Sequence, residues 1–383
     1  MAALAATGAF AQSTVTIDGS YDAGFQAIDY KGAKVNAIGN NGSTTSQINF
    51  RGSEDLGGGL KAEFRVETDW NTVSNNGNTG AKKADGTLAA ASTFGNGELR
   101  GGLVGGFGRV DFGAINNAQL DAYLTGQPFG TAIGSAFRGV FSTDAASAMG
   151  ASVVRFDNSA RYITPNFNGF SASVLGVQKN SKANSSNFST TTGNFDYAGV
   201  QEFSLRYNNG PINAIVASTK QDLAGTGLTA FTAGTAPAFG TTATADNTVS
   251  SATNTTLGAN YTFGDFTVYL LNQTAKNSLV SNGSATVDRS VTTVSGKYTM
   301  GSNVFIAQAG TAKNNIASAA NTGNTSIFSL GYDYNLSKMT SIYVRYENLG
   351  DKAALTTAPT QIAAADMTGT TRTRTALGLR GGF

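Results

Sequence analysis

Charged side chains recur at every second position along residues 60–70, and together these side chains could act on small ions. The row consists of Lys61, Glu63, Arg65, Glu67 and Asp69. A period of two places such a row on one face of a β-strand and the less polar intervening residues on the other, whereas a helix would mix the two sets. Charged groups held along one wall set up a field that favours one ion sign. The spacing therefore predicts a strand with one charged side.

The composition excludes several kinds of active site. Among 383 residues there is no histidine and no cysteine, which removes a Ser-His or Cys-His nucleophile, a zinc site of the usual ligands and any disulfide. The formal net charge of +2 is too balanced for a nucleic-acid-binding protein, which carries a strongly basic face. Only 13% of the residues are charged, about half the ~25% of an ordinary soluble domain. We therefore expect no enzymatic activity, no metal, no cofactor and no nucleic-acid partner.

The first residues have the pattern of an export signal. Residues 2–10 are apolar and rich in alanine, and Ala9, Phe10 and Ala11 form an A-x-A pattern typical of a cleavage site. We interpret residues 1–11 as a signal-peptide remnant and residues 12–383 as a single domain; the alternative is a disordered alanine-rich tail. No later stretch approaches the ~20 consecutive apolar residues that a membrane-spanning helix needs.

Alternation with a period of two continues through the chain and predicts an all-β protein. Sixteen strands are expected, near residues 13–27, 44–53, 60–70, 95–104, 109–115, 153–162, 169–178, 199–207, 212–220, 254–261, 266–274, 289–299, 303–311, 325–334, 340–348 and 371–383. Tight turns alternate with long polar links such as 221–253. A soluble β-sandwich has no reason to place all its long loops at one end, whereas an outer-membrane barrel has short periplasmic turns and long external loops. We therefore predict a 16-stranded antiparallel transmembrane β-barrel.

The last expected strand, 371–383, supports a closed barrel. Apolar and polar residues alternate along it as far as the aromatic Phe383. A membrane barrel must pair its last strand with its first, because an open edge in lipid leaves backbone groups without partners. We expect this strand to close the barrel.

Several segments resemble the trimeric general porins of Gram-negative bacteria, in the branch typical of β-proteobacteria and Neisseria. They are STVTIDG at 13–19, FRGSEDLGGGLKA at 50–62, GFGRVDFG at 106–113 and NSARY at 158–162. The hairpin at 50–62 is the most specific of them. The resemblance implies a homotrimer in the bacterial outer membrane that passes small hydrophilic solutes by diffusion. It also implies contact with outer-membrane lipid and lipopolysaccharide, and a role for Phe383 as the signal read by the barrel-assembly machinery.

The position of the longest link, 116–152, is similar to that of the third loop of these porins, which folds inward and narrows the lumen; the alternative is a mobile external loop. This loop offers Asp121, Arg138 and Asp144 to the constriction. Successive side chains of a strand point to opposite faces, and this alternation assigns seven basic residues to the inward faces of the strands that flank the loop: Arg51, Lys61, Arg65, Arg100, Arg109, Arg155 and Arg161. Five acidic residues share those faces: Glu63, Glu67, Glu98, Asp111 and Asp157.

The excess of basic over acidic wall residues predicts a weak preference for anions. A simpler interpretation is that these are solvated charges paired with one another, since isolated exposed pairs contribute little. Two other functions are compatible with the sequence: a substrate-specific outer-membrane channel, and an adhesin or structural barrel without significant conductance. A barrel lipase is excluded, because such enzymes need a histidine beside the nucleophile.

Overall fold

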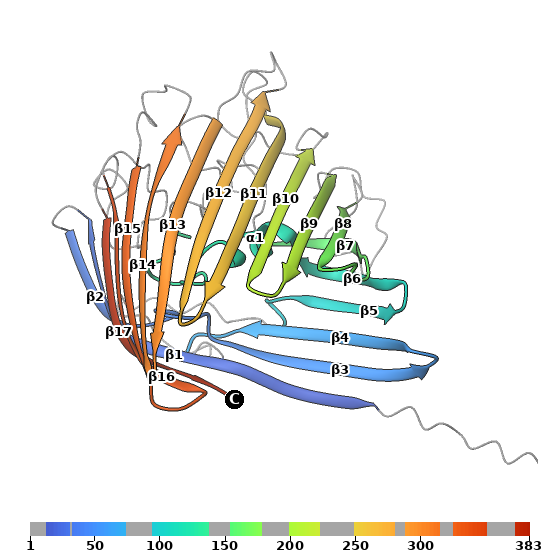
Figure 1. The fold of residues 1–383 in the computed structure, drawn as a ribbon, viewed down its shortest axis with the longest axis horizontal. Coiled ribbons are helices and arrows are strands. Elements are labelled where there is room, and N and C mark those ends of the chain that lie inside the picture. The colour runs from blue at the N-terminus through green and yellow to red at the C-terminus, as the bar shows by residue number, and fades with distance from the viewer. Residues whose placement is uncertain are drawn as a thin grey trace, which may run out of the picture.

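The alternating segments form strands that pair with their chain neighbours into a closed antiparallel β-barrel (Figure 1). The computed structural model describes residues 13–30, 33–73, 94–137, 154–177, 199–222, 249–279, 288–314, 325–350 and 372–383. The strands are β1 (Thr14–Tyr30), β2 (Ala33–Asn40), β3 (Gln47–Gly57), β4 (Leu60–Asp69), β5 (Leu99–Gly105), β6 (Gly108–Asn116), β7 (Arg155–Ile163), β8 (Phe170–Val177), β9 (Val200–Asn209), β10 (Ile212–Asp222), β11 (Val249–Phe263), β12 (Phe266–Leu279), β13 (Asp288–Met300), β14 (Asn303–Asn314), β15 (Thr325–Asn335), β16 (Thr340–Leu349) and β17 (Arg372–Gly382).

Strand β1 closes the barrel by pairing along both of its edges. One edge pairs with β17, and the other pairs with β2 along residues 23–30 and with β3 along residues 14–20. Because β2 and β3 share one side of β1, the 17 strand segments occupy 16 positions, which confirms the expected 16-stranded barrel. Strand β2 is not among the strands expected from the sequence, and the strand expected from residue 44 begins at Gln47.

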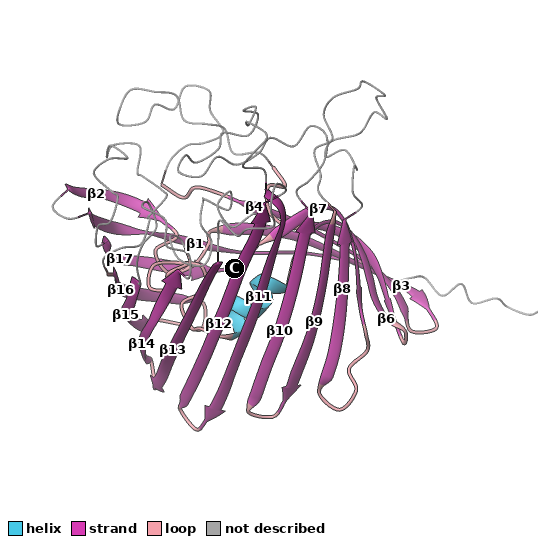
Figure 2. Cartoon of the chain, turned by 90° about the horizontal axis from the view of Figure 1, so that it is seen from above, coloured by secondary structure: helices cyan, strands magenta, loops and turns pink. Residues whose placement is uncertain are grey.

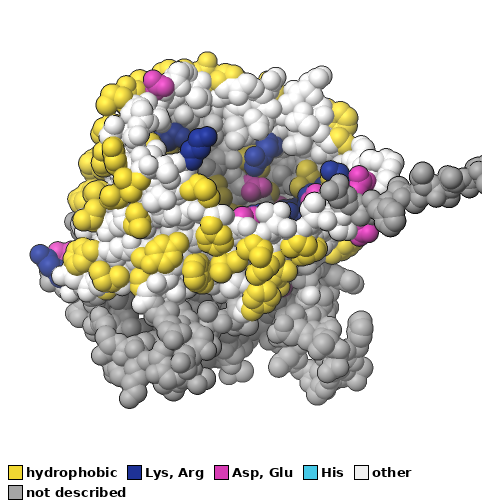
Figure 3. All heavy atoms as spheres, turned by 90° about the horizontal axis from the view of Figure 1, so that it is seen from below, with side chains coloured by type: hydrophobic (Ala, Val, Ile, Leu, Met, Phe, Trp, Pro, Cys, Tyr) yellow, Lys and Arg dark blue, Asp and Glu magenta, His cyan; other side chains and the backbone are white. Residues whose placement is uncertain are grey.

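The barrel is apolar outside and polar inside. Along β15, Phe328, Leu330 and Tyr334 are exposed, whereas Ser329 and Asp333 on the opposite face are buried. Figure 3 shows hydrophobic side chains across the outer surface and charged side chains within the hollow. A soluble sandwich would have the reverse arrangement, so this distribution fits a wall with lipid outside and water inside. Among the described residues, no helix is long and apolar enough to cross a bilayer.

Short turns join the strands at one end of the barrel. For example, residues 301 and 302 join β13 to β14, and Gly301 adopts a φ of +57°, which glycine reaches without steric cost. At the other end the long connections include residues 74–93, 178–198 and 223–248, which lie outside the described residues. Residues 1–12 lie outside them too, so the signal-peptide remnant at 1–11 stays a prediction.

The third loop, between β6 and β7, turns into the barrel as expected. It begins with helix α1 (Ala118–Thr125), whose N-cap residue Asn117 accepts a hydrogen bond from the backbone N–H of Leu120. Figure 2 shows α1 inside the ring of strands. The helix lies so close to β11 that a Cβ at Gly258 would overlap the carbonyl oxygen of Ala122, which explains why a glycine occupies this position.

Candidate pore constriction

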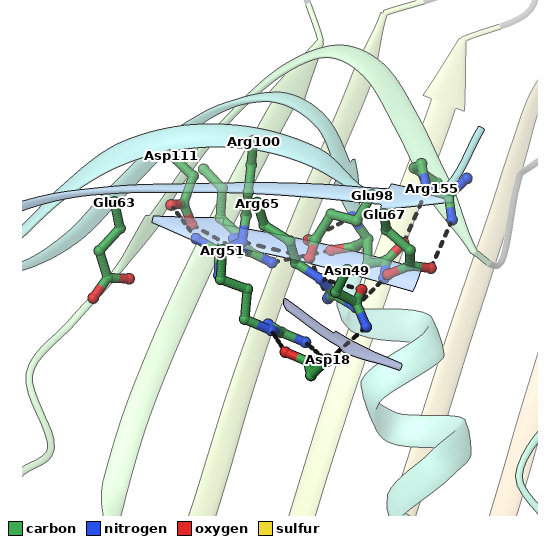
Figure 4. A network of polar contacts seen from close by, with 12 residues as sticks. Asp18, Asn49, Arg51, Glu63, Arg65, Glu67, Glu98, Arg100, Asp111 and Arg155 are labelled. Atoms are coloured by element: carbon green, nitrogen blue, oxygen red, sulfur yellow. Dashed lines mark hydrogen bonds and ion pairs between the residues drawn. The ribbon is translucent and has the colours of Figure 1, made fainter. Parts of the chain in front are cut away.

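A single network of charged side chains covers the inner wall from β1 across β3 to β7 (Figure 4). One centre of it is Asp111 of β6, a fully buried carboxylate that pairs with Arg100 at 3.3 Å, Arg109 at 2.8 Å and Arg161 at 2.7 Å. Arg109 also reaches Glu63 of β4 at 2.8 Å. The strand register explains this convergence, because Asp111 lies directly opposite Arg161 on β7.

A second centre is Glu98, which immediately precedes β5. Its carboxylate pairs with Arg65 at 2.7 Å and with Arg100 at 3.4 Å. Arg65 also pairs with Glu67 and donates two hydrogen bonds to the side-chain oxygen of Asn49, at 3.1 and 2.9 Å. These shared partners connect β3, β4, β5 and β6 through their side chains, in addition to their backbone ladders.

We call this set the water-facing network. It has six arginines, five carboxylates and one amide: Asp18, Asn49, Arg51, Glu63, Arg65, Glu67, Glu98, Arg100, Arg109, Asp111, Arg155 and Arg161.

Most arginines of the water-facing network are more exposed than its central carboxylates. The side chains of Asp111 and Glu98 are 0% and 5% exposed, while those of Arg161 and Arg51 are 12% and 40% exposed. The buried carboxylates therefore orient the guanidinium groups from behind, and the guanidinium groups meet the water of the lumen. Around these two centres the guanidinium groups are the more exposed partners, whereas Asp18 and Glu63 of the same network are 36% and 28% exposed.

The third loop is fixed to the wall formed by β9–β12. Its backbone N–H at Ala118 donates to the buried carboxylate of Glu202 at 2.7 Å. The side-chain amide of Gln119 donates to the carbonyl oxygens of Ala217 at 3.1 Å and Asn254 at 2.9 Å. A carboxylate at the first turn of a helix also stabilises the positive end of its dipole. These bonds hold α1 in place inside the lumen.

A second group of charges lies on β1 and β15–β17, and the sequence analysis did not identify it. Glu347 of β16 pairs with Arg372 at 3.1 Å and Arg374 at 2.7 Å, and it accepts hydrogen bonds from the backbone N–H groups of Gly134 and Ala136 in the third loop, at 3.1 and 2.9 Å. The whole group, which we call the sealed network, consists of Asp22, Asp333, Arg345, Glu347, Arg372 and Arg374. Strand parity places these residues inward, but parity carries no information on what covers them.

Comparison with known proteins places this barrel in a family. The Gram-negative porin family matches residues 1–354. The chain belongs to the Gram-negative porin family. It is 28% identical over 364 residues to outer membrane porin protein 32 of Delftia acidovorans, covering 93% of this chain and 90% of that one. Over 227 residues, 54% of each chain, it is 32% identical to an outer membrane porin protein of Bordetella pertussis.

Solved structures show the same fold. The anion-selective porin from Comamonas acidovorans has a TM-score of 0.70 at 23% identity, covering 97% of this chain and 100% of that one. A trimer form of OmpT from Vibrio cholerae has a TM-score of 0.61 at 14% identity, covering 97% and 99%. The protein is therefore an outer-membrane porin, and family membership implies a channel rather than an enzyme.

Six of the seven basic wall residues expected from the sequence lie in the water-facing network of this porin. The exception is Lys61, which is exposed near the β3–β4 turn on the same face of β4. In the third loop, Asp121 lies on α1 with its carboxylate 3.7 Å from Arg206 of β9. Arg138 and Asp144 lie outside the described residues. Phe383 exchanges two backbone hydrogen bonds with Gly19 of β1, at 3.1 and 3.2 Å, which extends the closing β1–β17 pairing to this residue.

Proposed function

We propose that this porin passes small hydrophilic solutes and ions along the water-facing network, with a weak preference for anions. The observation that supports it is that the central carboxylates Asp111 and Glu98 are 0% and 5% exposed, whereas the side chains of the arginines paired with them are 12% to 19% exposed. Six arginines against five carboxylates leave a net charge of +1 in the network. A positive lining lowers the barrier for anions and raises it for cations.

The likeness to a porin titled anion-selective, that of Comamonas acidovorans, agrees with this sign. The constriction residues of the proposal are the six arginines of the water-facing network on one side and Asp121 of α1 on the other. The third-loop residues Arg138 and Asp144 and the mouth residue Lys61 stay in the proposal as further charges along the path.

We also propose that the functional form is a homotrimer. The trimer form of OmpT, which shares the fold, supports this assembly. On this chain, Val15 and Ile17 of β1 are 70% and 56% exposed on the outer face, an apolar surface suited to contact with a second copy or with lipid. Outer-membrane lipid and lipopolysaccharide would surround the assembly, and Phe383 would be read by the barrel-assembly machinery.

The reversal potential in a salt gradient across a planar bilayer tests the anion preference. We expect Arg51→Gln to weaken the preference, because it leaves the Asp18 carboxylate without its 2.5 Å partner. We expect Asp18→Asn to strengthen it by the opposite charge change at the same place. Lys276→Gln on β12, which removes a positive charge from an exposed pair with Asp288 of β13, is the matched control and should leave the potential unchanged.

A wild-type potential of cation-selective sign would contradict the proposal. So would shifts of the same direction in Arg51→Gln and Asp18→Asn. Swelling of liposomes that contain the protein, measured with neutral sugars, separates a size limit from recognition of one solute. A sharp preference among sugars of equal size would indicate a substrate-specific channel. The absence of both bilayer conductance and liposome swelling would indicate an adhesin or structural barrel.

A further inference from the structure

The chain makes an inward excursion between β2 and β3 at residues 41–46, which we call the lumen strap. On β1, the partners of Asn40 and Gln47 are Ala23 and Ser20, which are three residues apart, whereas Asn40 and Gln47 are seven apart. Four residues are therefore in excess of what the barrel wall requires. A β-bulge usually accommodates one extra residue in a ladder, so a surplus of four leaves the plane of the wall.

Asp22 of β1 holds the lumen strap inside the barrel. Its fully buried carboxylate accepts hydrogen bonds from the backbone N–H groups of Gly42 at 3.0 Å, Ser43 at 2.8 Å and Thr44 at 2.9 Å. The hydroxyl of Tyr343 donates a fourth bond at 2.7 Å. Four hydrogen bonds offset the cost of burying this carboxylate, and three of them hold the strap.

The lumen strap reaches the third loop and strand β16. The hydroxyls of Thr45 and Thr131 lie 3.1 Å apart, which connects the strap to the third loop. Arg345 of β16 donates to the hydroxyl of Ser43 at 2.7 Å, and its guanidinium group lies 5.9 Å from the ring centroid of Phe129 in the third loop.

Apolar packing fills the space beside these polar contacts. Ile133 of the third loop packs with Tyr343 and Ala376 of the wall, and all three side chains are buried. The sealed network owes its burial to these contacts, because it lies between the strap, the third loop and the strands β15–β17.

We propose that the lumen strap is a second constriction element, which closes the lumen between the third loop and β1, β16 and β17. Solutes are thereby confined to the side of the water-facing network, and the strap and the third loop together set the size limit of the pore. The strap is a positioning element, with Asp22 as the residue that holds it. This inference rests on the channel activity of the porin and on the path proposed above, but not on the sign of its selectivity.

Cross-linking provides the first test, since the chain contains no native cysteine. In the variant Thr45→Cys/Thr131→Cys, the two sulfur atoms replace hydroxyls 3.1 Å apart and a disulfide needs only small adjustments. We expect oxidation to form the cross-link in the folded porin and to leave single-channel conductance equal to that of the reduced form. A cross-link that does not form in folded protein, or one that lowers conductance, would overturn the proposal.

Release of the strap provides the second test. We expect Asp22→Ala to raise single-channel conductance and to admit larger polyethylene glycols in a neutral-solute exclusion assay. Asp29→Asn, on the same strand in an exposed pair with Lys34, is the control and should change neither quantity. If Asp22→Ala does not fold, Ser43→Ala/Thr45→Ala removes the contacts to Arg345 and Thr131 and keeps the buried carboxylate.

An unchanged exclusion limit in the folded strap variants would overturn the proposal. Because the exclusion assay uses uncharged polymers, it is independent of the anion preference. A failure of the size prediction with an intact reversal potential would therefore count against the strap alone. A loss of selectivity with the expected size change would count against the proposed path of ions instead.

Discussion

Two networks of arginine and carboxylate side chains occupy neighbouring stretches of the inner wall, and they differ in their access to water. The arginine side chains of the water-facing network are between 12% and 40% exposed, whereas those of the sealed network are between 2% and 10% exposed. The residue types and strand positions are similar. The difference comes from what covers them: in the described part of the chain, the third loop bonds to Glu347 and the lumen strap bonds to Asp22 and Arg345 of the sealed network.

Burial under other parts of the protein changes how much an ion pair contributes to stability and whether its charges act on ions in the lumen. Exposed or partly exposed pairs contribute little to stability because water screens their attraction, so they serve as fixed charges in the lumen. Removing one partner of a buried pair strongly lowers the stability of the fold, because the remaining charge is left without solvation. We infer that the water-facing network determines which ions pass, and that the sealed network holds the third loop in place.

The variant Glu347→Gln tests the difference between the two networks with the largest expected effect. This variant leaves Arg372 and Arg374 buried with a neutral partner, and a broken buried pair costs about 3–5 kcal/mol. We expect a loss of that order in the free energy of unfolding, measured by urea titration with the fluorescence of Trp70, the single tryptophan. The bonds to Gly134 and Ala136 should also weaken, which would make the third loop more sensitive to protease.

The matched control for Glu347→Gln is Glu63→Gln. Glu63 belongs to the water-facing network, where its side chain is 28% exposed and pairs with Arg109. We expect a change of at most about 1 kcal/mol in the same titration. Equal losses in the two variants would show that burial does not distinguish the networks.

We expect a smaller effect from Gly258→Ala, which displaces α1 and so changes the width of the open lumen. A Cβ at this position would overlap the carbonyl oxygen of Ala122, so α1 must shift away from β11 toward the lumen. Overpacking of this kind costs about 1–3 kcal/mol. We expect lower single-channel conductance together with that loss of stability.

Gly296→Ala on β13 is the control for Gly258→Ala, because a Cβ at Gly296 would meet no atom within 4 Å. Its conductance and stability should equal those of the wild type. An unaltered conductance in folded Gly258→Ala would mean that the position of α1 does not limit the pore.

The smallest expected effect is on the pH dependence of selectivity. Partial desolvation inside the barrel raises the pKa of the Asp121 carboxyl above its usual value, against the lowering effect of Arg206 and Arg161. As the pH falls through that raised pKa, the carboxylate is protonated, the lumen loses a negative charge, and the anion preference rises. Asp121→Asn should show the higher preference already at neutral pH and a smaller change on acidification. A pH profile identical to the wild type would contradict this role of Asp121.

The alternation of side chains predicts the barrel, and it assigns to inward faces the six arginines that the structure joins in the water-facing network. Residues 60–70 illustrate why, since burial of one face and hydration of the other leave a period of two in the sequence. In strand β2 this pattern is short, since Ala33, Val35 and Ala37 alternate with polar residues but Ile38 departs from the period.

The sealed network was missed for a different reason. Arg345 and Arg51 have the same inward parity, and only the packing of the third loop and the lumen strap makes one buried and the other exposed. Gln119, which fixes α1 to β10 and β11, likewise has no local signal, because its partners lie about a hundred residues away in the chain.

The pairing of β1 with β17 has a consequence for how the chain folds. Most other strand pairs join chain neighbours, whereas this one brings Ser20 opposite Gly382. Its loop-closure entropy is the largest in the barrel, growing with the logarithm of the length enclosed. Hairpins need only local contacts, whereas ring closure brings together residues from the two ends of the barrel. We therefore expect the seam between the first and last strands to form last.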